Sequence, residues 1–228
     1  MSKRRTAGKL KYVNPAEPPL STAKKVFRLK PPLRLSKPAS PEPDMNEKEL
    51  AWKEHSREKV FNCRLFSIFE SICESPHHES RTFTVLDAAD WAIVVPVIET
   101  PKGKKLVMVW QWRHGAQELS LEFPGGVFEP DENPQDAAIR ELTEETGYKP
   151  GKIRKLGEFS PNPAIMSNKV HIFLAEDLVN TGRQHLDADE FVEVELVSPE
   201  TVCKGMGKPP YIHALMGSAL ALYLYSIS

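Results

Sequence analysis

Cysteine is scarce in this chain, which has three in 228 residues, Cys63, Cys73 and Cys203, with no C-x-x-C pair. This scarcity excludes a disulfide framework and a cysteine-rich zinc site, and it suits a reducing compartment. Long apolar runs are missing as well, since Trp91–Ile98 and residues 214–225 fall well short of the ~20 residues that cross a bilayer. The basic start leads into no apolar segment of the kind found in secretory signals. We therefore expect a cytoplasmic protein without a membrane span, with organelle targeting by the basic N-terminus as the alternative.

Net charge is nearly absent, because 30 Lys and Arg face 31 Asp and Glu, but the two signs are unevenly distributed. Residues 1–45 carry a net charge of +8 and eight of the 20 prolines, whereas residues 46–228 carry −9. A basic, proline-rich segment with few large apolar side chains cannot bury enough surface to offset its ordering entropy. We therefore expect a disordered tail at 1–45 and one globular domain at 46–228. The tail is either a solvated extension or a contact for a polyanion, because phosphates attract clustered cations.

Hydrophobic patterns in the domain indicate more strands than helices. The run Trp91–Glu99 is apolar and β-branched, as in a buried strand, and a turn at 101–103 (PKG) leads into a second strand at Lys105–Trp112. Further strands are expected at Val60–Glu70, Arg81–Leu86, Glu118–Phe123, Ile153–Phe159, Lys169–Ala175 and Phe191–Val197, and helices at 134–146, 199–204 and 210–226. Because the best helix lies between strands, we expect an α/β fold in which helices cover a mixed sheet.

The most informative segment is 125–148, GGVFEPDENPQDAAIRELTEETGY. Asn133 is a good N-cap, and Pro134 suits the first helical position, where no N–H is needed. Gly147 suits the left-handed position that follows many helices. These signals predict a helix over about 134–146.

Three glutamates, Glu141, Glu144 and Glu145, lie at i, i+3 and i+4 of this helix and so share one face. Like charges at this spacing destabilise a helix by about 0.2–0.5 kcal/mol per pair, and no cation at Thr143 or Thr146 relieves them. A hard divalent cation would explain the arrangement, because Mg²⁺ binds carboxylates and bridges to substrate phosphates. The alternative is a solvated acidic face, which the glycine pair before the helix and the charged residues around it disfavour.

Gly126, Glu132 and the run Arg140–Tyr148 (RELTEETGY) match every fixed position of the Nudix box. The chain therefore resembles a Nudix hydrolase. This resemblance implies an α/β/α sandwich with a mixed β-sheet. It also implies divalent-metal-dependent hydrolysis of a nucleoside diphosphate that is linked to another group.

The resemblance also gives roles to individual residues of the box. Arg140 and Glu132 would brace the loop against the helix, which is a structural role. Mg²⁺ or Mn²⁺ would be the cofactor, and its ligands would be Glu141, Glu144, Glu145 and the main-chain carbonyl of Gly125.

The residues around the box are similar to the ADP-ribose and nucleotide-sugar pyrophosphatases within that family. Residues 111–113 (QWR) and 122–126 (EFPGG) are similar to the subgroup patterns Q-[YW]-R and E-[LF]-P-[AG]-G. The segment 160–175 is similar to the next loop and strand of the subgroup. Two departures, Ala164 where the subgroup usually has glycine and Asn168 where it has an acidic residue, lie in a loop expected near the substrate. The identity of the sugar therefore stays open.

Three flanking residues are expected to bind the substrate. Arg113 presents a guanidinium, which suits bidentate contact with phosphate. Glu122 either reaches substrate or metal, or forms an ion pair with Arg113. Trp112 either stacks on an adenine or packs in the core. For the attacking water, the resemblance implies a glutamate in the acidic loop 187–190 as base or further metal ligand, and position favours Glu190. The expected catalytic residues are therefore Glu190, Glu144 and Arg113.

Together these features predict a metal-dependent pyrophosphatase of a nucleoside diphosphate sugar. ADP-ribose is the leading substrate, with AMP and ribose 5-phosphate as products. The alternatives are GDP-mannose, a dinucleotide or capped RNA, or a non-catalytic Nudix module that senses a nucleotide. Retention of all three box glutamates favours catalysis. The resemblance also implies a homodimer, because this subgroup commonly dimerises through its N-terminal strands.

Overall fold

A computed structural model describes residues 49–188 and 190–228 of the chain. The predicted tail, residues 1–45, lies outside these ranges, so its disorder, its polyanion contact and the domain boundary stay predictions. Within residues 49–188 and 190–228, no helix is both long and apolar enough to cross a membrane.

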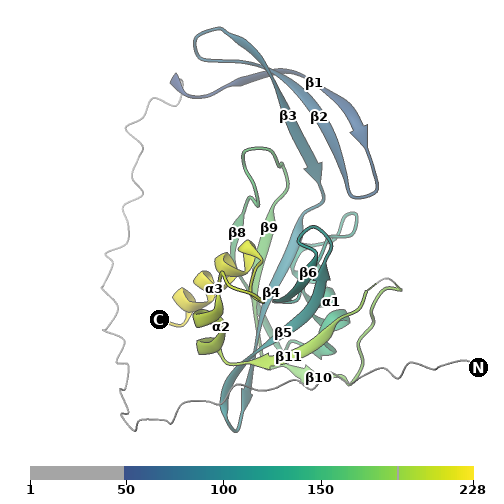
Figure 1. Cartoon of the computed structure of the whole chain (residues 1–228), viewed down its shortest axis with the longest axis vertical. Coiled ribbons are helices and arrows are strands. Elements are labelled where there is room, and N and C mark those ends of the chain that lie inside the picture. Colours follow the sequence, from purple (N-terminus) through teal and green to yellow (C-terminus); the bar gives the residue numbers. More distant parts are fainter. Residues whose placement is uncertain (1–48, 189) are drawn as a thin grey trace, which may run out of the picture. The chain divides into compact units, whose positions relative to one another are not determined.

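A mixed six-stranded sheet forms the centre of the described domain (Figure 1). β4 and β9 pair in parallel, whereas the other neighbouring strands pair antiparallel. The strand order is β11 (Glu193–Val197), β5 (Gly103–Arg113), β4 (Trp91–Thr100), β9 (Val170–Glu176) and β8 (Lys152–Phe159), with β6 (Glu118–Glu122) paired to β5. The apolar run of β4 is buried because both of its faces are covered.

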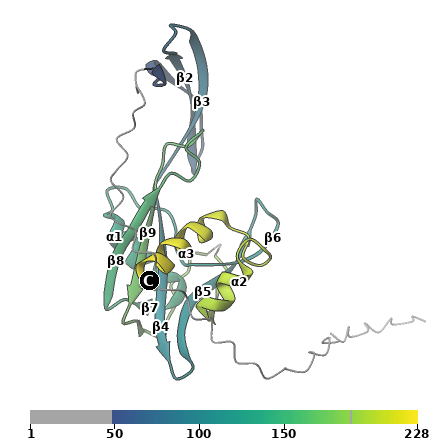
Figure 2. The same ribbon diagram turned by 90° about the vertical axis from the view of Figure 1, so that its left-hand side faces the viewer.

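Helices cover the two faces of this sheet, which gives the predicted α/β/α sandwich (Figures 1 and 2). Helix α1 (Pro134–Thr146) packs Leu142 into a core on one face. Helices α2 (Pro199–Gly205) and α3 (Ala214–Ser226) pack on the other face, where Met216 is part of the larger core. Successive side chains of a strand point to opposite faces, so β4 and β9 supply both cores in turn.

Local sequence determines where α1 begins and ends, as predicted. The side chain of Asn133 caps the helix, because its Oδ1 accepts the N–H of Gln135 at 2.9 Å. Gly147 ends the helix in a left-handed conformation, with φ of 69°, and its N–H donates to the carbonyl of Thr143. Both ends are thus fixed, and with them the face on which the three glutamates lie.

A second sheet precedes the sandwich and consists of β1 (Lys53–Asn62), β2 (Phe66–Glu74) and β3 (Ser80–Ala88), all antiparallel. The prediction of one strand over Val60–Glu70 is wrong, because the chain turns between β1 and β2. No glycine or proline marks this turn, and β1 is exposed along its whole length. The sequence there therefore lacks the alternation of buried and exposed positions that would have marked two separate strands.

Other boundaries differ by a few residues from the prediction. β11 begins at Glu193 rather than Phe191, and α3 begins at Ala214 rather than Pro210. The carbonyl of Pro210 instead accepts the N–H of Leu121 at 3.0 Å, so this segment is bound to β6 before the helix starts. A short ladder between β7 (Tyr148–Lys149) and β10 (Val179–Asn180) was not predicted, because two residues are too few to show a period.

Candidate active site

A glycine pair lets the chain pass from β6 to α1 in close contact with β4. A Cβ atom on Gly125 would overlap the carbonyl oxygen of Ala92, so this approach requires glycine. The carbonyl of Gly126 accepts the N–H of Ala92, and the N–H of Gly125 donates to Oε2 of Glu145, both at 2.9 Å. The carbonyl of Gly125 accepts no hydrogen bond from the described residues and is available to a ligand.

Arg140 braces this loop against α1. Its Nε and Nη2 donate to the two carboxylate oxygens of Glu132, at 2.9 Å each, and Nη2 also donates to the carbonyl of Val127 at 3.0 Å. The expected contact between Arg140 and Glu132 is therefore present, as a bidentate ion pair.

The same arginine also contacts two of the three glutamates on the helix face. Nη1 of Arg140 lies 2.8 Å from Oε1 of Glu141 and 3.1 Å from Oε2 of Glu144. Thr143 and Thr146 provide no relieving cation, as expected, but Arg140 supplies one from another position. Arg140 stands four residues before Glu144, a spacing that places both side chains on one side of the helix.

Glu145 has no such partner and is almost completely buried, with 5% of its surface exposed. Burial raises its pKa to about 8; repulsion by Glu141 and Glu190 adds to the rise, while the hydrogen bond from Gly125 opposes it. Burial also raises the pKa of Glu141, and Glu144 and Glu190 act in the same direction. Glu190 therefore lies within electrostatic reach of both helix carboxylates.

The donor set around α1 consists of oxygens only, which is the chemistry that hard divalent cations such as Mg²⁺ prefer. Among residues 49–188 and 190–228, no three His, Cys, Asp or Glu side chains already have the arrangement that holds a metal ion. The contacts above explain why, since Glu141 and Glu144 turn towards Arg140 and Glu145 turns towards Gly125. The residues fit the cation, and its binding remains a proposal.

Arg113 and Glu122 form the second part of the site. Nε and Nη2 of Arg113 donate to Oε1 and Oε2 of Glu122, at 2.8 and 2.6 Å. The ion pair considered for Glu122 is therefore present, and its contact with substrate or metal stays a prediction. Nδ1 of His213 also lies 2.6 Å from Oε2 of Glu122, whose side chain is 2% exposed. Burial opposes ionisation, but the hydrogen bonds from Arg113 and His213 lower the pKa of Glu122 to about 2.

Arg113 also interacts electrostatically with Glu145 on α1. Burial lowers the pKa of the Arg113 guanidinium. The hydrogen bonds and the charge of Glu122, together with the charge of Glu145, outweigh this effect and raise the pKa. Its side chain is 40% exposed, so the N–H groups that Glu122 does not use can reach a ligand. The charges of Arg113 and Glu145 therefore act on each other, while Glu122 pairs directly with Arg113.

Trp112 is not brought together with these residues. It precedes Arg113 on β5, so the two side chains point to opposite faces of the sheet. Trp112 lies opposite Leu119 in the β5–β6 ladder and is 49% exposed. Its stacking on an adenine stays a prediction.

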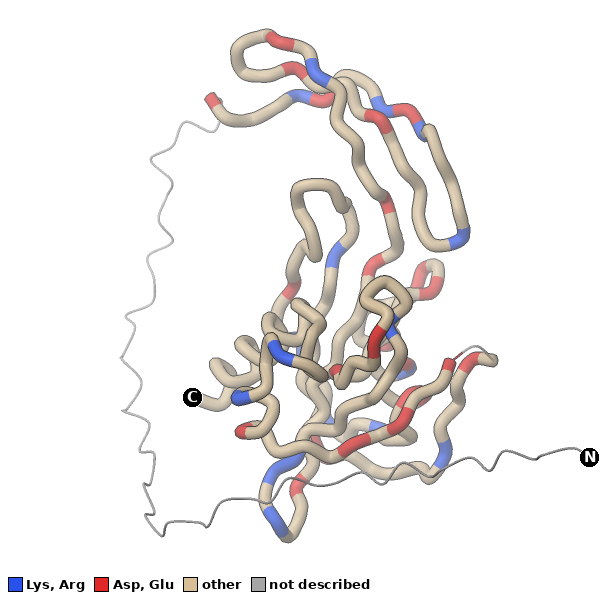
Figure 3. Tube along the Cα trace, in the orientation of Figure 1, with Lys and Arg blue, Asp and Glu red and all other residues tan. Residues whose placement is uncertain are grey.

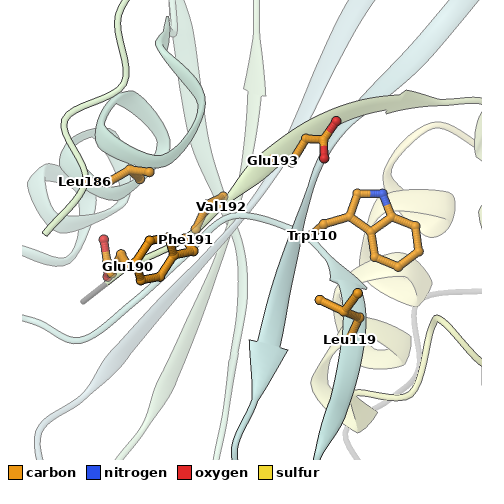
Figure 4. Close-up of a pocket in the computed structure, with 7 residues that line it drawn as sticks. All are labelled: Trp110, Leu119, Leu186, Glu190, Phe191, Val192 and Glu193. Atoms are coloured by element: carbon orange, nitrogen blue, oxygen red, sulfur yellow. The ribbon is translucent and has the colours of Figure 1, made fainter. Parts of the chain in front are cut away.

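A cavity of about 600 Å³ lies beside the acidic loop. In Figure 4, Glu190 and Phe191 stand on one side of it and Trp110 and Leu119 on the other. Acidic positions also follow one another along β11 and the segment leading into it (Figure 3). A partly apolar cavity that is also lined by Glu190 and Glu193 suits the organic part of a small ligand.

Sequence reasoning missed His213 and Gln184. His213 is 91 residues from Glu122 and belongs to no recognised motif, so the contact appears only after α3 packs on the sheet. Nε2 of Gln184 donates to the main-chain carbonyl of Glu145 at 2.5 Å. The main-chain N–H of His185 donates to the main-chain carbonyl of Glu144 at 2.9 Å. These bonds tie the segment before the acidic loop to the end of α1.

Comparisons with known proteins agree with this geometry. The NUDIX domain model matches residues 90–216. The ADP-ribose pyrophosphatase of Bacillus subtilis (strain 168) is 34% identical over 158 residues, 69% of this chain and 84% of the relative. The ADP compounds hydrolase NudE of Escherichia coli (strain K12) is 27% identical over 135 residues, 58% of this chain and 69% of the relative.

A solved structure supports the same fold. The crystal structure of an ADP compounds hydrolase superposes with a TM-score of 0.68 at 23% identity, and the match covers 78% of this chain and 95% of that one. Together with the match of the domain model and the carboxylate helix, these likenesses show that the chain belongs to the Nudix family and is a Nudix hydrolase.

Proposed function

We propose that this Nudix hydrolase is a Mg²⁺- or Mn²⁺-dependent pyrophosphatase of nucleoside diphosphate sugars, with ADP-ribose as its leading substrate. The products would be AMP and ribose 5-phosphate. The observation that carries this proposal is the position of Arg113, a phosphate-binding group, within electrostatic reach of the buried Glu145 on the carboxylate face of α1. The name of the Bacillus subtilis relative, ADP-ribose pyrophosphatase, supports the choice of substrate.

In this proposal the oxygens on α1 and its entry loop hold the cation. The ligands are Glu141, Glu144, Glu145 and the carbonyl of Gly125, which has no protein donor among the described residues. When bound, the cation would neutralise charge on the diphosphate and lower the pKa of a bound water. Arg140 would keep its bidentate hold on Glu132 and so maintain the position of the helix.

Arg113 and Glu190 have the two remaining roles. Arg113 binds a diphosphate oxygen through the N–H groups that point away from Glu122, and its charge stabilises the negative charge that builds up at phosphorus. Glu190 accepts the proton of the attacking water. Its electrostatic effect on Glu141 and Glu145 supports a position close to the reacting groups. The cavity beside Glu190 is then available to one organic end of the substrate.

The test is a hydrolysis assay on a panel of substrates with Mg²⁺ and with Mn²⁺. We would offer ADP-ribose, GDP-mannose, a dinucleotide and capped RNA, and identify the products by chromatography. Fastest release of AMP and ribose 5-phosphate from ADP-ribose is expected. Preference for GDP-mannose, a dinucleotide or capped RNA would overturn the substrate but keep the enzyme class.

A sensing module that does not hydrolyse its ligand is the competing function. It predicts binding of ADP-ribose without product, and an equal affinity in the Glu144→Gln variant. Because all three box glutamates are present, we expect turnover in the wild-type protein and its loss in this variant.

We further propose that the chain forms a homodimer through the three-stranded sheet β1–β3. Two large apolar side chains that share one face of this sheet, Phe61 and Ile72, are about half exposed, at 50 and 45%. Such a group of exposed apolar residues is typical of an interaction surface. Light scattering should give twice the chain mass for the wild type and a monomer for Ile72→Glu, and a monomeric wild type would contradict the proposal.

A further inference from the structure

We propose that His213 is a positioning residue for binding of the substrate diphosphate, acting through the carboxylate of Glu122 that it shares with Arg113. This inference rests on the function proposed above and adds to it a residue outside every recognised motif. His213 would fix the guanidinium of Arg113 without touching the reacting atoms.

The contacts converge on one oxygen atom. Oε2 of Glu122 lies 2.6 Å from Nη2 of Arg113 and 2.6 Å from Nδ1 of His213, while Oε1 receives Nε of Arg113 at 2.8 Å. The Glu122 side chain is 2% exposed, and hydrogen bonds from both partners favour its ionised form. An ionised carboxylate only accepts, so Nδ1 of His213 must carry the hydrogen.

This sharing has a consequence for Arg113. A carboxylate that binds one guanidinium alone offsets much of the positive charge of that guanidinium. The second donor from His213 fixes Oε2 from another element, α3, and takes up part of the negative charge of Glu122. Arg113 is thus held in one orientation, and more of its positive charge remains available to a diphosphate.

A purely structural role for His213 is the competing explanation, because this residue is the N-cap of α3. Its φ and ψ of −79° and 118° suit a cap, but its side chain makes no capping hydrogen bond with the described part of the helix. Ser, Asn and Asp are the residues that cap best. A better capping residue at this position would stabilise the helix more than histidine does. The contact of the histidine side chain with Glu122 is therefore not explained by capping.

Two substitutions separate these roles. His213→Ser provides a good cap but is too short to reach Glu122, whereas His213→Asn places an amide N–H as far from the backbone as Nδ1 and can donate to Oε2. His77→Ser, in the exposed turn between β2 and β3, is the matched control. All four proteins would be compared by thermal melting and by kcat and KM for ADP-ribose.

We expect His213→Ser to raise KM about tenfold, as for the loss of a hydrogen bond to a charged group, with kcat within about twofold. Its melting temperature should stay close to that of the wild type, because the better cap offsets the lost hydrogen bond to Glu122, and His213→Asn should keep a KM close to the wild-type value. A wild-type KM in His213→Ser would overturn the proposal. So would an equal rise of KM in both His213 variants, because it would show that the hydrogen bond is irrelevant.

A binding measurement distinguishes this inference from the function on which it rests. Calorimetric titration with inorganic pyrophosphate and Mg²⁺ needs no turnover. If the wild type hydrolyses no nucleoside diphosphate sugar, the proposed function fails, and weaker pyrophosphate binding by His213→Ser would still support the positioning role. Equal pyrophosphate affinity in the wild type and His213→Ser would overturn that role, whatever the protein hydrolyses.

Discussion

Arg140→Ala should act mainly through stability, because Arg140 holds together the loop and the helix that form the site. Its side chain is 24% exposed and contacts the carboxylates of Glu132, Glu141 and Glu144, of which the first two are 12% exposed. Removing the guanidinium leaves these acids close together without a counter-charge. For partly buried ion pairs of this kind, the expected loss is about 2–4 kcal/mol of unfolding free energy, after allowance for solvent screening.

This loss can be measured directly. A domain of 150–250 residues shifts its melting temperature by about 2–4 °C per kcal/mol, so Arg140→Ala should melt roughly 5–15 °C lower. Urea unfolding in EDTA gives the free energy without any contribution from bound metal. Arg64→Ala, in the exposed turn between β1 and β2, is the control for loss of an arginine and should change the free energy by less than about 0.5 kcal/mol.

Two further variants assign the loss to the bidentate contact. Arg140→Lys keeps the charge but cannot bind both oxygens of Glu132, so its stability should be intermediate. Combining Arg140→Ala with Glu132→Gln should give a loss clearly smaller than the sum of the single losses. An unchanged melting temperature together with abolished hydrolysis would refute the bracing role and place Arg140 in the chemistry.

Three other predictions address the carboxylates and the tail. Glu144→Gln and Glu145→Gln should each lower turnover at saturating Mg²⁺ at least ~100-fold with little change of the melting temperature in EDTA, because Glu144 loses only a partly exposed ion pair and Glu145 loses a costly buried charge; near-wild-type turnover in both would refute the metal assignment. The pKa of Glu122 is about 2 in the folded protein against 4.5 unfolded, so its stabilising effect is complete above pH 4.5 and is lost as the pH falls towards 2. Between pH 5 and pH 3, urea unfolding should show the wild type losing about 2 kcal/mol more than Glu122→Gln, and equal losses would contradict this. A chain that begins at Asn46 should keep its turnover on small substrates, and a truncated chain that folds but is inactive would contradict this. If the full chain binds RNA, that binding should weaken steeply with salt and should be lower in the truncated chain.

The parts of the fold that sequence predicted well are those governed by near neighbours in the chain. Helix α1 runs from Pro134 to Thr146, as expected, because Asn133 and Gly147 determine its ends by local hydrogen bonds and backbone conformation. The buried strands β4 and β9 were equally clear, since apolar runs covered on both faces leave an unbroken pattern. In contrast, β1 is exposed throughout, and nothing in its sequence separates it from β2.

The candidate site likewise has one half that near neighbours in the chain determine and one half that they do not. Arg140 contacts Glu132, eight residues away, and Glu144, four residues away, so motif and helix periodicity indicate most of this half. The other half depends on contacts over long distances in the chain. Glu122 meets His213 because the segment before α3 hydrogen-bonds to β6, and a pattern read along the sequence cannot specify such a contact.

The burial of Glu145 favours a bound cation more than the repulsion between the three helix glutamates does. Arg140 already offsets the charges of Glu141 and Glu144, so the spacing of the three glutamates does not by itself require a metal. Glu145 is different, because it is 5% exposed and its carboxylate accepts one N–H, that of Gly125, among the described residues. A buried carboxylate in these surroundings is costly to ionise, and its pKa of about 8 reflects that cost. A divalent cation would remove the cost and would draw Glu141 and Glu144 away from Arg140, which keeps its contacts with Glu132 and Val127 in either case.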